Sequence, residues 1–177
     1  MGKNKERIIY TIGHSNRTSQ YFLDLLQAFH VETVVDVRTI PKSRSNPQFH
    51  QDALKKELKK QKIAYVHLKK LGGLRHAKKD SPNTGWENAS FRGFADYMQT
   101  GEFKDGLAEL IDLAKETLCA VMCAEAVPWR CHRSLIADVL TLKKWKVYHI
   151  QSKRTAKAHE LTPFLHKQGR KIVYAER

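Results

Sequence analysis

The side chains best suited to chemistry in this 177-residue chain lie together in residues 121–134. This segment contains two thiols, a carboxylate, an imidazole and two guanidinium groups, from Cys123, Glu125, Arg130, Cys131, His132 and Arg133. An apolar run typical of a buried strand, residues 118–122, leads into it, and residues 134–140 follow with the apolar spacing of a helix. Because ligands of open α/β sheets bind where strands end and helices begin, we expect the reactive site here.

The two thiols of this segment should differ in acidity. Free N–H groups and the dipole of a helix favour a thiolate in its first turn, and Cys131 lies there beside several cations. We therefore expect Cys131 to be the better thiolate, and Cys123, at the end of the strand, to be more buried and less acidic. Either cysteine could act as a nucleophile. The residues that we consider for proton transfer are Glu125, His14 and His132.

Polar side chains also follow three other expected strands, at residues 8–12, 33–37 and 63–67. The carboxyl ends of parallel strands meet at one edge of a sheet, so these groups should converge on residues 123–133. The residues predicted to bind an anionic substrate there are Ser15, Asn16, Arg38, Ser43, Arg44, Gly72, Gly73 and Arg133. Taken singly, each also fits a structural role: Asn16 can cap a helix, and Arg38 can pair with Asp36.

The spacing of the cysteines excludes one thiol chemistry and leaves two open. A cysteine phosphatase requires Cys-x5-Arg, whereas the sixth residue after Cys123 is Trp129. A redox pair of Cys123 and Cys131 requires Cα atoms within about 7 Å. Zinc could bind both thiols together with His132 or His14, although no Cys-x2-Cys pair is present. We predict no cofactor, and zinc is the alternative.

Strands and helices alternate along the chain, which indicates a mainly parallel sheet with helices on both faces. The expected strands are residues 8–12, 33–37, 63–67, 118–122 and 147–150, with a further one at 172–174. Helical spacing is present near residues 22–29, 51–62, 91–98, 103–114 and 134–140. We therefore expect one three-layer, Rossmann-like α/β domain over residues 1–177. Residues 69–88 form a long loop that is a candidate for mobility, and residues 151–177 form a C-terminal extension.

Positive charge dominates the composition, because 32 Lys and Arg residues against 18 acidic residues give a formal net charge of +14. Such a balance favours association with polyanions, although it equally fits a solvated surface. The lysines that we predict to contact nucleic acid are Lys55, Lys59, Lys69, Lys70, Lys78 and Lys79. Aromatic residues are not interleaved with them, which argues against stacking on a single strand.

Hydropathy and cysteine content bear on the compartment. No apolar run approaches the length of a transmembrane segment, and residues 1–7 lack the apolar part of a signal peptide. Three cysteines without framework spacing indicate reduced thiols. We therefore expect a cytoplasmic protein with no membrane partner.

Four ordered motifs resemble the family described as domain of unknown function 488. They are residues 11–16, residues 35–38 with 41–44, residues 65–67 with 71–73, and residues 123–133. The resemblance extends from about residue 8 to residue 150 and implies a small α/β domain with a site at these motifs. It implies no particular reaction.

The convergence of four motifs on one sheet edge favours an enzyme with a cysteine-containing, phosphate-binding pocket. Its substrate would be a phosphate-bearing small molecule, such as a nucleotide, or a nucleic acid. Two other hypotheses remain: a non-catalytic basic protein that binds nucleic acid, and a scaffold stabilised by zinc.

Overall fold

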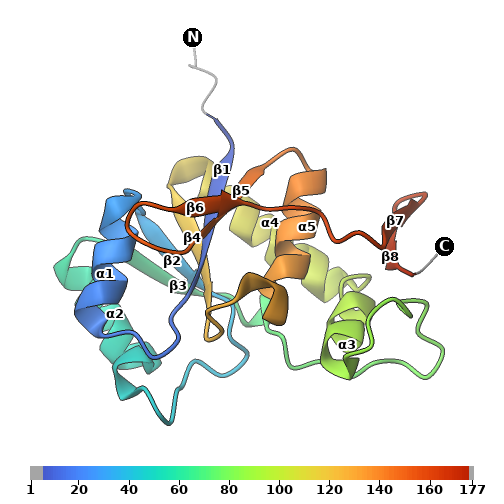
Figure 1. Cartoon of the computed structure of the whole chain (residues 1–177), viewed down its shortest axis with the longest axis horizontal. Helices are drawn as coiled ribbons and strands as arrows, with labels where there is room; N and C mark the ends of the chain where they lie inside the picture. Colours follow the sequence, from blue (N-terminus) through green and yellow to red (C-terminus); the bar gives the residue numbers. More distant parts are fainter. Residues whose placement is uncertain (1–5, 176–177) are drawn as a thin grey trace.

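A six-stranded sheet forms the centre of the molecule in this computed structural model, which describes residues 6–175 (Figure 1). Its strands are β1 (Ile8–Gly13), β2 (Thr33–Asp36), β3 (Ala64–His67), β4 (Cys119–Cys123), β5 (Lys146–Ile150) and β6 (Ala156–Ala158). Their order is β3-β2-β4-β1-β5-β6, with β1 to β5 parallel and β6 antiparallel to β5. The five predicted strands of a mainly parallel sheet are confirmed.

Helices cover both faces of this sheet. The pair α1 (Ser19–Ala28) and α2 (Gln51–Lys60) lies on one face, and α3 (Ala89–Tyr97), α4 (Gly101–Glu116) and α5 (Arg133–Leu142) lie on the other. Alternate strand residues supply the two cores: Val34 packs with α1 and α2, whereas Val35 packs with the other three helices. The three-layer, Rossmann-like fold predicted from the sequence is therefore confirmed.

Capping and apolar spacing explain where the helices begin. Thr18 caps α1 by accepting a hydrogen bond from the Tyr21 backbone N–H, and Thr100 caps α4 in the same way. The basic helix α2 buries only Leu54 and Leu58, so it presents most of its lysines to solvent. These helices match the positions expected from helical spacing.

The C-terminal residues add structure beyond the sheet. After β6, the chain forms a hairpin of β7 (Leu165–Gln168) and β8 (Lys171–Tyr174), which contains the strand predicted at residues 172–174. Gly169 has a φ of +62° at the turn, a conformation that glycine adopts without steric cost. Figure 1 shows this hairpin beside α3 and α5.

The long connection before α3 is held by one buried carboxylate. It starts with the 3-10 helix η2 (Lys69–Leu71). Further along, Asp96 of α3 accepts hydrogen bonds from the backbone of Lys78 and the side chains of Ser81 and Asn83. Asn83 in turn accepts from the Tyr174 backbone N–H. These bonds tie the connection to α3 and to the hairpin, while its mobility stays a prediction.

Within residues 6–175, no helix is both long and apolar enough to cross a bilayer.

Candidate functional site

A cavity of about 690 Å³ opens at the carboxyl edge of the sheet, and we call it the sheet-edge cavity. Four segments line it: the chain after β2, the turn after η2, the start of α3, and residues 123–132. The lining residues are Arg38, Thr39, Ile40, Lys42, Gly73, Leu74, Asn88, Ser90, Phe91, Cys123, Ala124, Glu125, Trp129, Arg130, Cys131 and His132. Six of the predicted site residues are among them: Arg38, Gly73, Cys123, Glu125, Cys131 and His132.

Strand order explains this convergence. β4 lies between β1 and β2, so the chain leaving it passes between the ends of two neighbouring parallel strands. The register pairs Cys123 with Gly13 of β1 and Met122 with Asp36 of β2. A side chain on Gly13 would collide with the Glu125 backbone, so glycine is required for this close approach.

Arg133 is fully buried and fixes the chemistry of Cys123. Its Nη1 lies 2.6 Å from Cys123 Sγ and also donates to the Glu125 carbonyl, while Nη2 donates to the Ala126 carbonyl at 3.0 Å. Its Nε donates to Thr11 Oγ1 at 3.2 Å. All three nitrogens of the guanidinium therefore donate to groups of the protein. Arg133 does not line the cavity, and it contacts Cys123 Sγ from the buried side.

The order of acidity expected for the two thiols is wrong. Burial raises the pKa of Cys123, but the Cys131 S–H, 2.7 Å away, and the Arg133 guanidinium together lower that pKa to about 7. Burial and the donation to Cys123 raise the pKa of Cys131 well above its ordinary value. The Cys131 S–H and the Arg133 guanidinium both point to Cys123 Sγ, so these contacts favour the thiolate form at Cys123 and not at Cys131.

The helix that follows begins later than expected. Pro128 starts a separate 3-10 helix, η3 (Pro128–Arg130), Cys131 is extended, and α5 begins only at Arg133. Cys131 therefore precedes the first turn of α5 rather than lying within it. The backbone N–H of Arg133 still points to Cys131 Sγ at 3.5 Å, so one helix donor reaches the thiol.

His132 is held in one orientation beside Cys131. Its Nε2 lies 3.0 Å from the Val37 carbonyl, which can only accept, so Nε2 carries the proton. Nδ1 is then the acceptor, 3.5 Å from Cys131 Sγ. Burial and the neighbouring Arg133 lower the pKa of His132 to about 4, so the ring is neutral at pH 7. The neutral ring is a weak base and has no proton on Nδ1 to donate, so Nδ1 can only accept a hydrogen bond from Cys131.

Arg38 lines the cavity, but its guanidinium is largely used within the protein. Nη2 and Nε bind both oxygens of Asp36, the closest contact being 2.7 Å, and Nη1 donates to the Phe49 carbonyl. Tyr65 donates to the same carboxylate at 2.6 Å. The structural pairing of Arg38 with Asp36 is thus present. Its role in binding an anion stays a prediction.

His14 is buried behind this pair and does not line the cavity. Its Nδ1 donates to the Ser15 carbonyl, and its Nε2 faces Arg38 Nη1 at 3.4 Å. Burial lowers its pKa. Both ring nitrogens are therefore engaged, and this geometry gives His14 no path to a substrate.

The remaining predicted binding residues lie outside the cavity lining. Ser15 bonds to Asn16 at the turn after β1, and the Ser43 carbonyl contacts His50. Arg44 is exposed. Gly72 packs against Thr39, where a side chain would clash. None of these five residues has a contact that assigns it to a ligand.

The predicted nucleic-acid lysines come from separate elements. Lys55 and Lys59 lie on α2, at the left of Figure 1, whereas Lys78 and Lys79 lie in the connection before α3, at the right. Lys70 pairs with Glu109 of α4 at 3.1 Å. The cluster in the sequence is therefore spread over the molecule.

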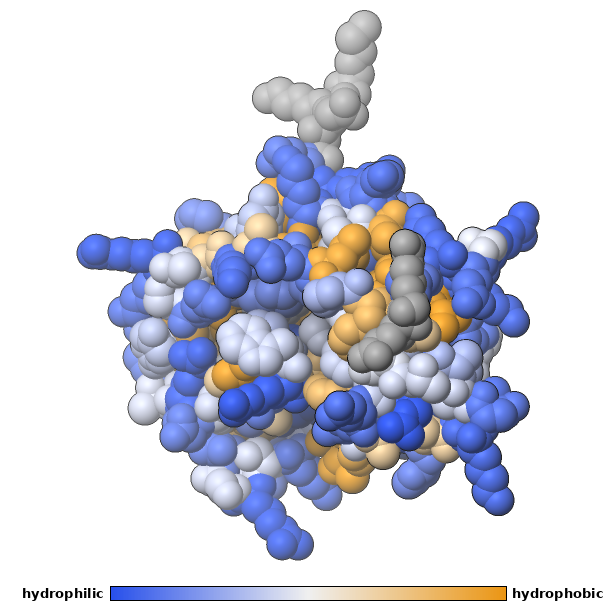
Figure 2. Space-filling view, turned by 45° about the vertical axis from the view of Figure 1, so that its right-hand side comes forward, coloured by the Kyte–Doolittle hydropathy of each residue, from blue (hydrophilic) through white to orange (hydrophobic). Residues whose placement is uncertain are grey.

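The exposed apolar residues at the opening of the sheet-edge cavity were not predicted from the sequence. Ile40, Leu74 and Trp129 are 58%, 69% and 64% exposed, and all three line the opening. On the face seen in Figure 2, the surface is mostly hydrophilic with small apolar patches. Three large exposed apolar residues at one opening are a signal for a ligand. Only Trp129 lay in a motif, so the sequence carried a weak hint.

A buried polar chain behind Arg133 was also not foreseen. Thr11 Oγ1 lies 2.5 Å from His149 Nδ1, and His149 Nε2 lies 2.8 Å from His159 Nδ1. His159 Nε2 lies 2.7 Å from Asp138, which also accepts from Tyr174. Burial lowers the pKa of His149 to about 3. These groups anchor Thr11, which holds Arg133 in place.

The zinc alternative finds no support in the arrangement of ligands. Within residues 6–175, no group of three or more His, Cys, Asp or Glu side chains could hold a metal ion. His132 Nδ1 lies beside the two thiols Cys123 and Cys131, but the Arg133 guanidinium already contacts Cys123 Sγ at 2.6 Å, and zinc binding stays a prediction.

Comparison with known proteins identifies the family. Searches of curated proteins and of solved structures found no match. Residues 18–140 match the family model described as domain of unknown function DUF488. The matched range contains Arg38, both thiols of the cavity and Arg133, and it begins after His14. The chain therefore belongs to the DUF488 family.

Proposed function

We propose that this protein is an enzyme that uses the Cys123 thiolate as a nucleophile in the sheet-edge cavity. The observation that carries the proposal is the 2.6 Å contact between Arg133 Nη1 and Cys123 Sγ. A buried cation beside a thiol that lines a cavity stabilises the reactive form of the thiol at neutral pH. A structural cysteine needs no such partner, as Cys119 shows, because its pKa is raised by burial.

In the proposed step, Cys123 Sγ forms a bond to an electrophilic atom of the substrate as the bond to the leaving group breaks. The Cys131 S–H holds the thiolate through its hydrogen bond. Glu125 is exposed at the cavity and is the group placed to exchange a proton with the leaving group. His132 is less suited to donate, since its pKa is about 4.

The proposed substrate is a phosphate-bearing small molecule such as a nucleotide. Lys42 and Arg130 are exposed at the cavity, and no ion pair within residues 6–175 uses either of them. Trp129 offers a flat apolar face at the same opening. Cations beside an aromatic ring suit a phosphate attached to a base. The cavity volume of about 690 Å³ is in the range of small-molecule sites.

The test is alkylation of the protein by iodoacetamide as a function of pH, with the modified cysteine identified by mass spectrometry. Cys123 should react with a midpoint near pH 7, while Cys119 in the same molecule serves as the unreactive control. Adenosine monophosphate should slow the reaction in the wild type and less in Trp129→Ala. If neither Cys123 nor Cys131 reacts faster than free cysteine at pH 7, the nucleophile proposal is wrong.

A dithiol oxidoreductase is the second candidate, because the Cys123 and Cys131 sulfurs lie 2.7 Å apart. The Cys123 thiolate would attack a disulfide substrate, forming a mixed disulfide and releasing one thiolate. Cys131 would then attack Cys123 Sγ, and its proton would leave with the second thiolate as the mixed disulfide breaks. The protein disulfide that remains balances the two electrons gained by the substrate.

Glutathione disulfide tests this second candidate directly. The wild type should lose two hydrogens in mass, whereas Cys131→Ser should stop as a glutathione adduct on Cys123. The matched variant Cys119→Ser should behave as wild type. Alkylation at pH 7 without any disulfide formation would leave the nucleophile proposal and remove this one.

The net charge of +14 supports one non-catalytic alternative, the binding of nucleic acid. Lysine contacts to phosphates release counterions, so affinity should fall steeply with salt. Filter binding of a duplex across a salt series tests it, and the absence of binding at low salt excludes it.

A further inference from the structure

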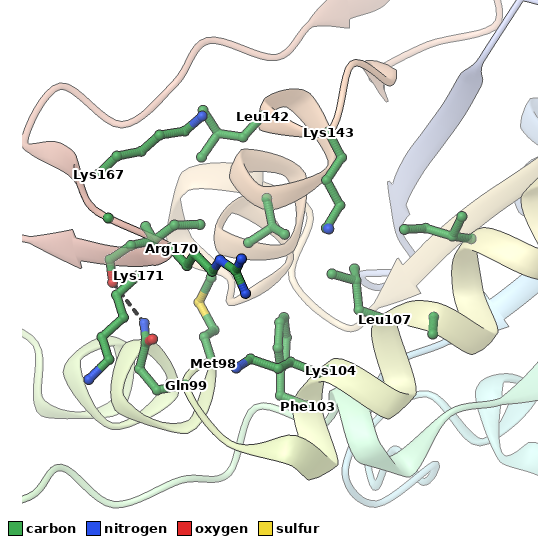
Figure 3. Close-up of a pocket in the computed structure, with 15 residues that line it drawn as sticks. Met98, Gln99, Phe103, Lys104, Leu107, Leu142, Lys143, Lys167, Arg170 and Lys171 are labelled. Carbon is green, nitrogen blue, oxygen red and sulfur yellow. Dashed lines mark hydrogen bonds between the residues drawn. The ribbon is translucent and has the colours of Figure 1, made fainter.

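A second cavity lies away from the thiols, between α4, the end of α5 and the β7–β8 hairpin (Figure 3). Its volume is about 570 Å³, and we call it the hairpin pocket. α5 connects the two cavities, because its start adjoins the sheet-edge cavity and its last residue, Leu142, lines the hairpin pocket. Ten helical residues span about 15 Å, so the two cavities are separate.

The walls of the hairpin pocket are apolar. They are formed by Met98, Phe103, Leu107, Ala108, Ile111, Val139, Leu142 and Ile172. Several of these residues belong to the main hydrophobic core or pack against it, so the walls are fixed by the fold. A pocket of this size with apolar walls can enclose an alkyl chain or a pair of aromatic rings.

Among residues 6–175, the ionisable residues at the rim of the pocket are all positively charged. They are Lys104, Lys143, Lys167, Arg170 and Lys171. No ion pair within residues 6–175 involves any of the five. In Figure 3, Lys104, Lys143 and Arg170 direct their charged ends toward the space between the helices and the hairpin.

The orientation of α4 makes this arrangement more than a reflection of overall charge. α4 contains five acidic residues, Glu102, Asp105, Glu109, Asp112 and Glu116, and two lysines. None of the five acids lines the pocket, whereas Lys104 does. The acidic helix α4 therefore offers a lysine, and none of its acids, to the apolar pocket.

We propose that the hairpin pocket binds a small amphipathic anion, with an aliphatic or aromatic body in the apolar space and a carboxylate, sulfonate or phosphate group at the cationic rim. The rim cations are exposed, so they stay hydrated in the free protein and are available to contact an anion. The apolar body supplies most of the binding free energy, and the rim selects for charge. This site is independent of the thiol chemistry proposed above.

Two dyes that differ by one charged group provide the test. 1-Anilinonaphthalene-8-sulfonate has two aromatic units and a sulfonate, and N-phenyl-1-naphthylamine has the same aromatic units without the charge. Titrated against the full chain by fluorescence, the sulfonate should bind about tenfold or more tightly than the neutral dye, because only it contacts the rim. Decanoate should displace it.

Matched variants assign the binding to this pocket. Lys104→Gln, Lys143→Gln and Arg170→Gln combined should weaken the sulfonate dye about tenfold and leave the neutral dye unchanged. The control triple variant is Lys55→Gln, Lys59→Gln and Lys78→Gln, which changes the net charge equally and should stay within about twofold. Ala108→Trp, at an exposed lining position, should fill the pocket and abolish binding of both dyes.

Three results would overturn the proposal. They are equal affinity for both dyes, equal loss in the two triple variants, and no displacement by decanoate. If vesicles of phosphatidylglycerol bind the protein through the same cations while decanoate fails to displace the dye, the rim is a membrane-contact surface and the pocket has no role. In every case, alkylation of Cys123 should be unaffected, which keeps this test separate from that of the thiol site.

Discussion

Two buried cations lie at the sheet edge in addition to the exposed Lys42 and Arg130, whereas every cation of the hairpin pocket is exposed. At the sheet edge, Arg38 and Arg133 are buried and bonded to protein groups. At the hairpin pocket, Lys104, Lys143 and Arg170 are exposed and have no ion-pair partner among residues 6–175. A buried cation is held by groups of the protein and therefore tunes them, whereas an exposed one is free to meet a ligand. Counting charges in the sequence cannot separate these two roles.

Removing the partner of a buried cation should have the largest effect on stability. Asp36→Asn leaves the buried Arg38 guanidinium without its carboxylate and weakens the Tyr65 hydrogen bond. We expect the free energy of unfolding to fall by about 3–5 kcal/mol, measured by denaturant titration. The matched control is Glu6→Gln, which breaks the exposed Lys146 pair and should lower the free energy of unfolding far less, because solvent screens this pair. Equal losses in the two variants would show that burial does not distinguish these pairs.

Acid should destabilise the sheet-edge region through two histidines. Burial lowers the pKa of His132 to about 4 and that of His149 to about 3, so both are neutral in the folded chain at pH 5. In the unfolded chain the two imidazoles take up protons below about pH 6.5, whereas in the folded chain they do so only near pH 4 and pH 3. The free energy of unfolding therefore falls as the pH is lowered from about 6.5 to these values. We expect a loss of roughly 2–4 kcal/mol between pH 6.5 and 4.5.

The matched variants for this prediction are His149→Gln and His76→Gln. His76 is exposed, so His76→Gln serves as the control for the loss of a histidine. His149→Gln should flatten the slope of stability against pH, even if it lowers stability at pH 7 through the lost contacts with Thr11 and His159. If the slope of stability against pH is the same in both variants, the loss of stability in acid does not come from the buried imidazole of His149.

The guanidinium of Arg133 should control the acidity of Cys123. Arg133→Lys keeps the charge but loses the fork that reaches Cys123, Glu125 and Ala126 together. We expect the pKa of Cys123 to rise by about one unit or more, so that alkylation at pH 7 slows by several-fold to about tenfold. Arg130→Lys, at an exposed position, is the control and should leave the pH midpoint in place. A midpoint unmoved by Arg133→Lys would assign the acidity to another group.

The fold and the general place of the site could be predicted because they depend on patterns that are local in the sequence. Alternating apolar runs gave the five parallel strands, and parallel strands bring their carboxyl ends together. The position of β4 between β1 and β2 could not be predicted from the sequence, because strand order depends on how distant segments pair. That order is what brings Cys123 beside Gly13 and close to the chain after Asp36.

The prediction of which thiol is more acidic failed for a different reason. Position near a helix start favoured Cys131, but the direction of the Arg133 side chain decides the outcome, and that direction depends on Thr11, Glu125 and Ala126. The hairpin pocket was missed because its cations come from α4, α5 and the hairpin. Lys104 and Arg170 are separated by many residues, so no spacing rule connects them.

The smallest effect on stability should come from replacing the cations at the rim of the hairpin pocket. This change gives the clearest contrast with the loss of a partner of the buried Arg38. Replacing Lys104, Lys143 and Arg170 by glutamine removes three positive charges that no ion pair within residues 6–175 uses. Each change should therefore alter the free energy of unfolding by less than about 0.5 kcal/mol, and removal of like charges from one rim can even raise stability slightly. Denaturant titration at low and high salt measures this. A loss as large as that of Asp36→Asn would show that these cations hold the fold, and the contrast between tuning cations and ligand-binding cations would then fail.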